Sequence, residues 1–258
     1  MTLTFKTSGK MAILAYTAVA GMAFSPAAHA QDATFSEAQK ENIGAIVKEY
    51  LMDNPNVIME AIDAYRSQQE QEAQKRAEAQ ISGNMEFLTR ADAPSVGNPE
   101  GDITIVEFFD YNCGYCKRAL PDIQKVVESD KNVRVVFKEM PILGPTSKIA
   151  ALWALAAHNQ DKYFDFHIAL MEHRGPKDEA QMEKLAEKTG LDIEQMKKDI
   201  ASGELEKELQ KVLDVAREIG VSGTPAFIVG SSFIPGYVGE EGLKQAIKAE
   251  REKRKNDG

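Results

Sequence analysis

The sequence predicts an α/β domain preceded by a helical extension. Short segments dense in β-branched and aromatic residues alternate with longer segments of helical periodicity, in the order β-α-β, helical block, β-β-α. In the extension, apolar residues recur at helical spacing. The only two cysteines of the chain, Cys113 and Cys116, lie where the first strand of the domain runs into its first helix.

Residues 1–30 have the pattern of a secretory signal peptide. Lys6 and Lys10 form a basic start, Met11 to Phe24 is an apolar run, and Ala28-His29-Ala30 resembles a cleavage site. The apolar run is short for a transmembrane span, although an uncleaved anchor is the alternative. We expect an exported, periplasmic protein that begins near Gln31, in a compartment that permits disulfides.

The charge balance excludes two classes of partner. The chain has 31 basic and 40 acidic residues, for a net charge of −9. Removal of the signal peptide takes away two lysines and no acid. An acidic protein of this kind is not expected to bind nucleic acid or an anionic membrane surface.

Residues 31–90 are predicted to form a helical extension and linker. Phe35 to Tyr65 has helical periodicity, broken at Asn54-Pro55, where proline favours the start of a new helix. Ser67 to Gln80 is polar and is interpreted as a solvated helix or linker. The apolar stripes of residues 35–65 either pack back onto the domain or meet the same stripes of sister chains in a homo-oligomer.

Residues 91–258 are predicted to form the α/β domain, which begins at the Pro- and Gly-rich segment Ala93 to Gly101. Helical residues follow from Cys113, a helical insertion occupies about 146–219, and a charged helix closes the chain. The expected strands are 103–109, 133–137, 226–229 and 232–234. The first two strands, with the helix between them, are expected to be parallel.

The spacing of the cysteines allows redox chemistry. Two residues separate Cys113 from Cys116, so one helical turn can bring the sulfurs within disulfide distance. A sulfur at a helix N-terminus is stabilised as a thiolate. The alternative is a structural bridge, but closing so small a loop removes little entropy from the unfolded chain.

These residues resemble a known family. A strand that ends in a C-x-x-C helix start, together with Thr224-Pro225 directly before a later strand, resembles the thioredoxin fold. The helical insertion resembles that of the DsbA family of thiol–disulfide interchange proteins. The segment Glu49 to Ile58, with the sequence EYLMDNPNVI, resembles the N-terminal extension of ScsC-like members of that family.

The resemblance implies catalytic roles for the cysteine motif. Cys113 would be the nucleophile and Cys116 the resolving thiol. Gly114 and Tyr115 would tune the thiolate, and because this dipeptide lacks a histidine we expect a less oxidising pair. No cofactor is expected other than a redox-active Cys113–Cys116 disulfide.

The resemblance also implies two supporting features. Thr224-Pro225 matches the cis-proline loop, where proline leaves the backbone beside the sulfur open to substrate; a trans proline at a strand start is the alternative. Glu107 matches a buried acid that could relay the proton of Cys116. The alternative for Glu107 is a glutamate on the solvent side of its strand.

No metal site is expected. His158, His167 and His173 lie in the helical insertion without metal-ligand spacing. Two thiolates could bind Cu(I), and a role of ScsC-like proteins in copper tolerance keeps that alternative open.

The function expected from these features is disulfide isomerisation on misoxidised exported proteins that contain cysteine. A membrane redox partner would maintain the dithiol, and the resemblance implies a homotrimer joined through residues 35–65. The alternatives are a monomeric dithiol oxidase or reductase, and a copper-binding protein.

Overall fold

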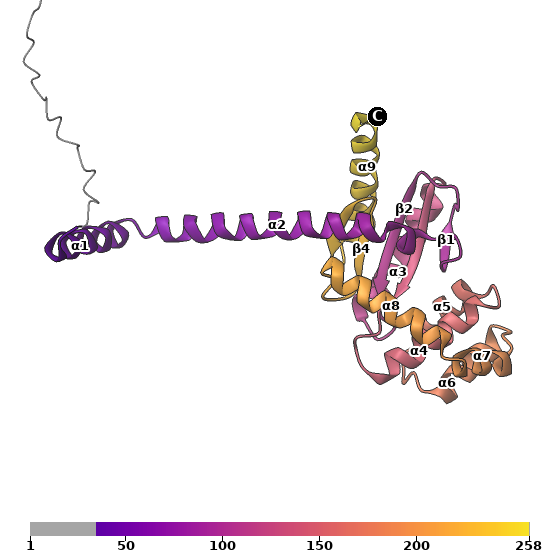
Figure 1. Cartoon of the computed structure of the whole chain (residues 1–258). Coiled ribbons are helices and arrows are strands. Elements are labelled where there is room, and N and C mark those ends of the chain that lie inside the picture. Colours follow the sequence, from indigo (N-terminus) through magenta and orange to yellow (C-terminus); the bar gives the residue numbers. More distant parts are fainter. Residues whose placement is uncertain (1–34, 258) are drawn as a thin grey trace, which may run out of the picture. The chain divides into compact units, whose positions relative to one another are not determined.

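The structure is a computed structural model that describes residues 35–257 (Figure 1). The predicted signal peptide and its cleavage site lie outside the described residues. Two compact units form the chain, divided after Met59, and each is described by itself. Among the described residues, no helix is both long and apolar enough to cross a membrane.

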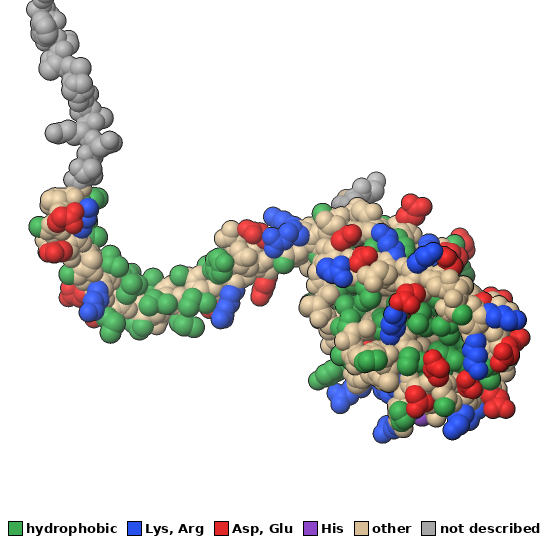
Figure 2. Space-filling view, turned by 60° about the horizontal axis from the view of Figure 1, so that its bottom comes forward, with side chains coloured by type: hydrophobic (Ala, Val, Ile, Leu, Met, Phe, Trp, Pro, Cys, Tyr) green, Lys and Arg blue, Asp and Glu red, His purple; other side chains and the backbone are tan. Residues whose placement is uncertain are grey.

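Two helices form the predicted extension, α1 (Glu37–Asp53) and α2 (Asn56–Thr89). Ser36 caps α1, because its hydroxyl accepts from the Gln39 backbone N–H while the Gln39 side chain accepts from the Ser36 N–H. No residue of α1 is buried. Figure 2 shows apolar side chains over α1 and the start of α2. The exposed large apolar residues there are Phe35, Ile43, Ile46, Val47, Tyr50, Met52, Ile58, Met59, Ile62 and Tyr65.

A five-stranded mixed sheet, in the order β1-β3-β2-β4-β5, forms the centre of the second unit. The strands are β1 (Ser95–Gly97), β2 (Ile103–Phe109), β3 (Val133–Glu139), β4 (Ala226–Val229) and β5 (Ser232–Pro235). β2 and β3 are parallel, as predicted, and the other pairs are antiparallel. β1 was not expected, because its residues lie in the Pro- and Gly-rich segment.

Helices cover both faces of this sheet (Figure 1). Alternate residues of a strand point to opposite faces. Ile105 and Phe109 of β2 therefore pack in one cluster with α3 (Gly114–Ser129) and α9 (Gly239–Asp257). Val106 and Phe108 pack in another with α2 and α8 (Glu204–Ile219). Cys116 belongs to the first cluster, so the face of β2 that carries Glu107 is the face beneath the cysteines.

The C-terminal part of α2 belongs to the core of the domain. The segment 67–80 is helical throughout, and Ala77, Ile81 and Leu88 are buried. Two cations of β3 bind the carbonyl oxygens that the end of α2 leaves without helical partners. Arg134 donates to Thr89 O at 2.8 Å, and Lys138 donates to Phe87 O at 2.8 Å. The helix is therefore fixed to the sheet at this end.

The helical insertion runs from α4 to α8, and α4 to α7 lie together at one end of the sheet (Figure 1). The remaining helices are α4 (Pro145–His158), α5 (Tyr163–Glu172), α6 (Glu179–Lys188) and α7 (Ile193–Ala201). The predicted α/β fold with a helical insertion and an N-terminal helical extension is confirmed.

Candidate active site

Cys113 is the N-cap residue of α3. Its Sγ accepts a hydrogen bond from the Cys116 backbone N–H at 3.4 Å and lies 3.2 Å from the carbonyl oxygen of Thr224. A hydrogen bond from the Cys116 thiol lowers the pKa of Cys113 to about 5, and Thr224 and backbone N–H groups of the first turn act in the same direction. A pKa below 7 favours the thiolate at neutral pH. A thiolate is the nucleophilic form of cysteine.

Cys116, one turn further along α3, is the opposite of Cys113 in its chemistry. It is buried against the core cluster, and burial raises the pKa of its thiol far above the ordinary value. Its hydrogen bond to Cys113 and the nearby Glu107 act in the same direction. The outer sulfur is therefore ready to attack, whereas the inner sulfur must first lose a proton to a base.

Glu107 lies beneath the cysteines in the middle of β2. Its register partners are Phe137 on β3 and Phe227 on β4, and the residue is 1% exposed. Its Oε1 is buried without a hydrogen-bond partner among the described residues. Burial, together with the charge of Cys113, raises the pKa of the Glu107 carboxyl well above its usual range. This is the buried alternative for Glu107, and such a carboxyl can hold a proton near neutral pH.

The peptide bond of Thr224-Pro225 is cis, and it lies directly before β4. Pro225 is buried while Thr224 is half-buried. The contact between Thr224 O and Cys113 Sγ brings two segments 111 residues apart onto one sulfur. Proline has no N–H, so no backbone donor is present at Pro225.

Gly114 and Tyr115 lie exposed between the two cysteines. The Tyr115 side chain is 56% exposed, with its ring centroid 6.1 Å from that of Tyr237 and the Arg118 guanidinium 5.0 Å from its ring. Tyr237 also donates to Asp122 Oδ2 at 2.6 Å. These contacts form an aromatic rim on one side of Cys113, and sequence reasoning missed Tyr237 because it lies far away in the chain.

Asp110 holds the loop between β2 and α3 in place. Its carboxylate accepts two bonds on each oxygen, all between 2.7 and 2.9 Å. The donors are the backbone N–H groups of Asn112, Ile142 and Leu143 and the Ser147 hydroxyl. Because Ser147 belongs to α4, the insertion fixes the loop that carries the first cysteine. The sequence signal was a lone acid after a strand, which does not reveal its partners.

A buried polar cluster lies behind this loop. Glu139 Oε1 accepts from the Tyr163 hydroxyl at 2.8 Å and the Tyr111 hydroxyl at 3.2 Å. The Tyr111 oxygen also lies 3.0 Å from His167 Nδ1. Burial lowers the pKa of His167 to about 3, so the imidazole is neutral. Two of these residues come from α5, so the cluster joins the insertion to the ends of β2 and β3.

The three histidines of the insertion make other contacts in the structure. His167 is buried in the cluster with Tyr111, while the side chains of His158 and His173 contact backbone carbonyl oxygens. Among residues 35–257, no three potential ligands are grouped as a metal ion would require.

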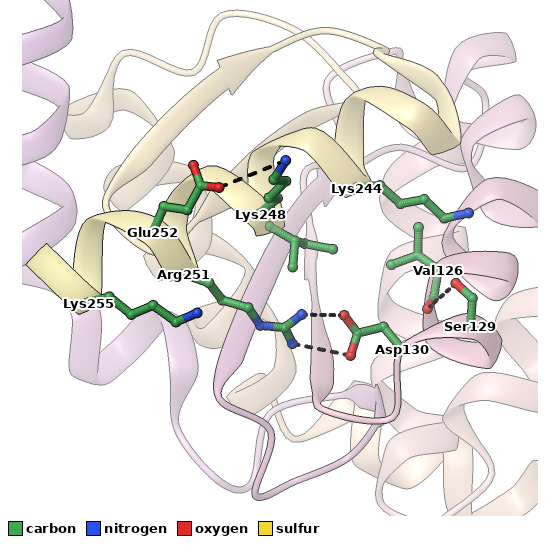
Figure 3. A pocket seen from close by; sticks show the side chains of 9 residues that line it. Val126, Ser129, Asp130, Lys244, Lys248, Arg251, Glu252 and Lys255 are labelled. Carbon is green, nitrogen blue, oxygen red and sulfur yellow. Dashed lines mark hydrogen bonds and ion pairs between the residues drawn. The ribbon is translucent and has the colours of Figure 1, made fainter.

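A hollow of about 470 Å³ between α3 and α9 is separate from the cysteines (Figure 3). Its Arg251 points toward Asp130 and binds it at 2.6 Å, and Arg251 also binds Asp102. The guanidinium thus holds α9 to the loops at the start of β2 and β3. The charge of Arg251 is thus matched by two carboxylates, and Lys244, Lys248 and Lys255 also line the hollow.

The amino-acid sequence matches a family model over residues 104–248, the DSBA-like thioredoxin domain. The chain belongs to this family. A second model, the copper resistance protein ScsC N-terminal domain, matches residues 39–72, which include most of α1 and the first half of α2. The resemblance inferred from C-x-x-C, Thr224-Pro225 and the extension is confirmed.

Solved structures of the same fold include proteins with and without the extension. A thioredoxin-like oxidoreductase from Silicibacter pomeroyi is 43% identical, with a TM-score of 0.63 over 65% of this chain and 97% of that one. BcfH from Salmonella enterica Typhimurium is 27% identical, with a TM-score of 0.70 over 82% of this chain and 95% of BcfH. A periplasmic thioredoxin-like protein from Salmonella enterica is 29% identical, with a TM-score of 0.57 over 64% and 94%.

Curated relatives match mainly the domain. The Na(+)/H(+) antiporter NhaA 1 of Salinispora arenicola is 29% identical over 153 residues, which are 58% of this chain but only 24% of that protein. The chain thus spans about a quarter of the length of the first relatives it matches. The probable disulfide bond formation protein D of Bacillus anthracis is 26% identical, over 65% of this chain and 82% of its own length.

Proposed function

We propose that the protein is a periplasmic thiol–disulfide oxidoreductase that corrects wrong disulfides in exported proteins. The observation that carries this proposal is the asymmetry of the two sulfurs. Cys113, at the N-terminus of α3, has a pKa of about 5, whereas Cys116 is buried and keeps its proton. A thiolate at a helix N-terminus beside a thiol that keeps its proton is what disulfide exchange requires.

The first step is attack by the Cys113 thiolate on a disulfide of the client. A bond forms between Cys113 Sγ and one client sulfur, the client disulfide breaks, and the other client sulfur leaves as a thiolate. In isomerisation, a different client thiolate attacks the same client sulfur of this mixed disulfide. The client then carries a new disulfide, and Cys113 leaves as a thiolate. No net electrons pass between client and enzyme.

Escape from a stalled mixed disulfide requires Cys116. Glu107 takes the Cys116 proton, Cys116 attacks Cys113 Sγ, and the client leaves with a reduced thiol while a Cys113–Cys116 disulfide forms. The buried Oε1 of Glu107, without a hydrogen-bond partner among the described residues, supports this role. A membrane redox partner would then supply two electrons to regenerate the dithiol. In this scheme Gly114, Tyr115 and Thr224-Pro225 shape the surface that receives the client.

Assembly into a homotrimer through residues 35–65 is part of the proposal. Ile46 is 65% exposed, and the large apolar residues of α1 and early α2 are not buried against any part of the chain that the structure describes. Their match to the ScsC N-terminal domain supports a shared role for this segment. Several linked sites would raise the effective concentration of thiolate around one misfolded client.

A second candidate function is net oxidation of client dithiols by the Cys113–Cys116 disulfide. It is favoured by the names of relatives such as disulfide bond formation protein D. The same site would serve, but the resting state in cells would be the disulfide.

Refolding of scrambled ribonuclease tests the proposal. Reduced wild-type protein should restore ribonuclease activity, and Cys113→Ala should restore none. Oxidised wild-type protein acting on fully reduced ribonuclease tests the second candidate. Faster activity in this second assay, with none in the first, would favour the oxidase. If neither assay depends on Cys113, the oxidoreductase proposal is wrong.

A further inference from the structure

One face of α2 lines a hollow that leads towards the site. Glu70, Ala73, Gln74 and Ala77 follow each other at helical spacing, so they share this face. Two of these residues are alanines, and their small side chains leave space between α2 and the rest of the domain. The hollow has a volume of about 470 Å³.

The opposite wall of this hollow consists of the end of α8 and the edge strand. Ile219 at the end of α8 and Gly220 directly after it line one part, and Phe233 and Pro235 line the other from β5. Phe233 and Pro235 point to the same face of β5, because alternate residues of a strand do so. Apolar side chains thus stand on both sides of the hollow, with Arg76 and Glu218 adding charge to its lining.

A second, smaller hollow lies between this one and the proline loop beside Cys113. It has a volume of about 160 Å³ and is lined by Thr224 and Pro225, and it shares Phe233 and Pro235 with the first. Thr224 O in turn lies 3.2 Å from Cys113 Sγ. The two hollows therefore lie next to each other at β5, one reaching the proline loop that contacts Cys113 and the other reaching α2.

The strand between the hollows has a free edge. β5 is the last strand of the sheet and pairs only with β4 among the described residues. The unpaired backbone groups of an edge strand can bind an extended polypeptide, while pockets beside the edge receive its side chains. Asn84 of α2 donates to Glu218 of α8 at 3.2 Å, so this bond fixes α2 to α8, whose Glu218 lines the hollow.

We propose that α2 forms the outer wall of a client groove, which binds an extended, apolar segment next to the client cysteine. The inference rests on the proposed function and adds a second role for the helix that leaves the extension: α2 would select clients as well as carry the site. Folded proteins bury such segments, so the groove would favour clients that are still unfolded or misfolded.

The test compares Ala73→Trp with the matched control Ala79→Trp. Both alanines are exposed on α2, but only Ala73 lines the hollow. The probes are glutathione disulfide and mixed-disulfide peptides with six apolar residues on one side of the cysteine, in both orientations. We expect Ala73→Trp to slow reaction with at least one long peptide about tenfold, the effect of losing ~1.4 kcal/mol. Glutathione rates should stay at the wild-type value, and Ala79→Trp should leave all rates unchanged.

Equal peptide rates in Ala73→Trp and the wild type would overturn the inference. If Ala73→Trp instead changes the sedimentation of the protein and no peptide rate, the hollow receives a second copy of the chain and the inference is likewise wrong. Failure of the proposed function looks different, because the wild type would then not react even with glutathione disulfide.

Discussion

The extension and the domain depart from the usual rule of burial in opposite directions. Residues 35–65 expose large apolar side chains such as Ile46 and Tyr50, whereas the domain buries charged or polar ones such as Glu107, Lys138 and His167. Soluble proteins normally show neither feature in clusters. Exposed apolar side chains in the extension indicate that another surface covers them. Buried polar side chains in the domain indicate either a chemical role or a role in anchoring one element to another.

Within the domain, the hydrogen bonds distinguish anchoring from chemistry. Lys138 donates to Phe87 O, and Asp110 accepts four bonds, so both have structural tasks. Glu107 Oε1 and His167 Nε2 are buried without partners among the described residues. Of these two, only Glu107 is coupled to the cysteines: it raises the pKa of the Cys116 thiol, and Cys113 raises the pKa of Glu107 itself. An unpartnered buried carboxyl beside a reacting thiol indicates a proton acceptor.

The largest effect is expected from breaking the apolar surface of the extension. Ile46→Gln together with Ile62→Gln should convert the oligomer into monomers and abolish the correction of scrambled ribonuclease, because the sites are no longer linked. Sedimentation velocity measures the assembly. Ala45 lies on the side of α1 opposite to the stripe that includes Val47 and Tyr50, by helical spacing. The control Ala45→Gln should therefore stay assembled. If the wild-type protein is a monomer, the proposed oligomer is wrong. If the variant is monomeric but fully active, isomerisation does not depend on assembly.

Deletion of residues 31–90 is not a suitable substitute for these two substitutions, because it would also remove part of the domain core. Ala77, Ile81 and Leu88 pack in the core of the domain, and a buried side chain of the size of Ile81 or Leu88 contributes roughly 1.5–3 kcal/mol to stability. A deletion that ends before Glu70 keeps these contacts and the part of α2 that forms the outer wall of the groove.

A smaller effect is expected from Glu107→Gln. Without a base for the Cys116 proton, release of the mixed disulfide should slow roughly a hundredfold, while attack by Cys113 is retained. Mass spectrometry of quenched reactions with glutathione disulfide should show the mixed disulfide accumulating. The exposed control Glu100→Gln should behave like the wild type. Unchanged release in Glu107→Gln would assign the buried carboxyl a structural task instead.

The smallest effect is a pH-dependent change in stability. The folded-state pKa of Cys113, about 5, lies below the ordinary value of 9.0. Because the pKa of Cys113 is lower in the folded than in the unfolded state, its thiolate stabilises the fold. This stabilisation is fully present above pH 9 and is lost as the pH falls to 5. The unfolding free energy of the reduced wild type minus that of reduced Cys113→Ser should therefore rise from pH 5 to pH 8, by at most about 1.4 kcal/mol per unit. Urea unfolding measures it, and a flat difference would contradict the lowered pKa.

Much of the fold could be predicted because local signals agreed with tertiary structure. Strand β2 and strand β4 are rich in β-branched and aromatic residues, and Asn54-Pro55 separates the first two helices. β1 was missed because Ser95–Gly97 owes its extended state to pairing with β3 and not to its own residues. The packing of α2 was missed because Ala77 and Ile81 are sparse apolar residues in a polar segment.

The candidate site was predictable where a motif carries its own geometry. Cys113, Cys116 and Thr224-Pro225 are recognisable from spacing and resemblance. The hydrogen bonds around Tyr111 were not, because its partners Glu139 and His167 lie 28 and 56 residues further along the chain. Such partners are set by how β3 and α5 pack, which no local pattern records.

The central claim is that the domain uses its buried groups to keep one sulfur ionised and the other protonated. The most direct measurement is the rate of alkylation of the reduced wild-type protein by iodoacetamide as a function of pH, with the modified cysteine identified by mass spectrometry. We predict labelling of Cys113 alone, with a midpoint near the pKa of about 5. A midpoint above pH 8, or equal labelling of Cys116, would contradict the account.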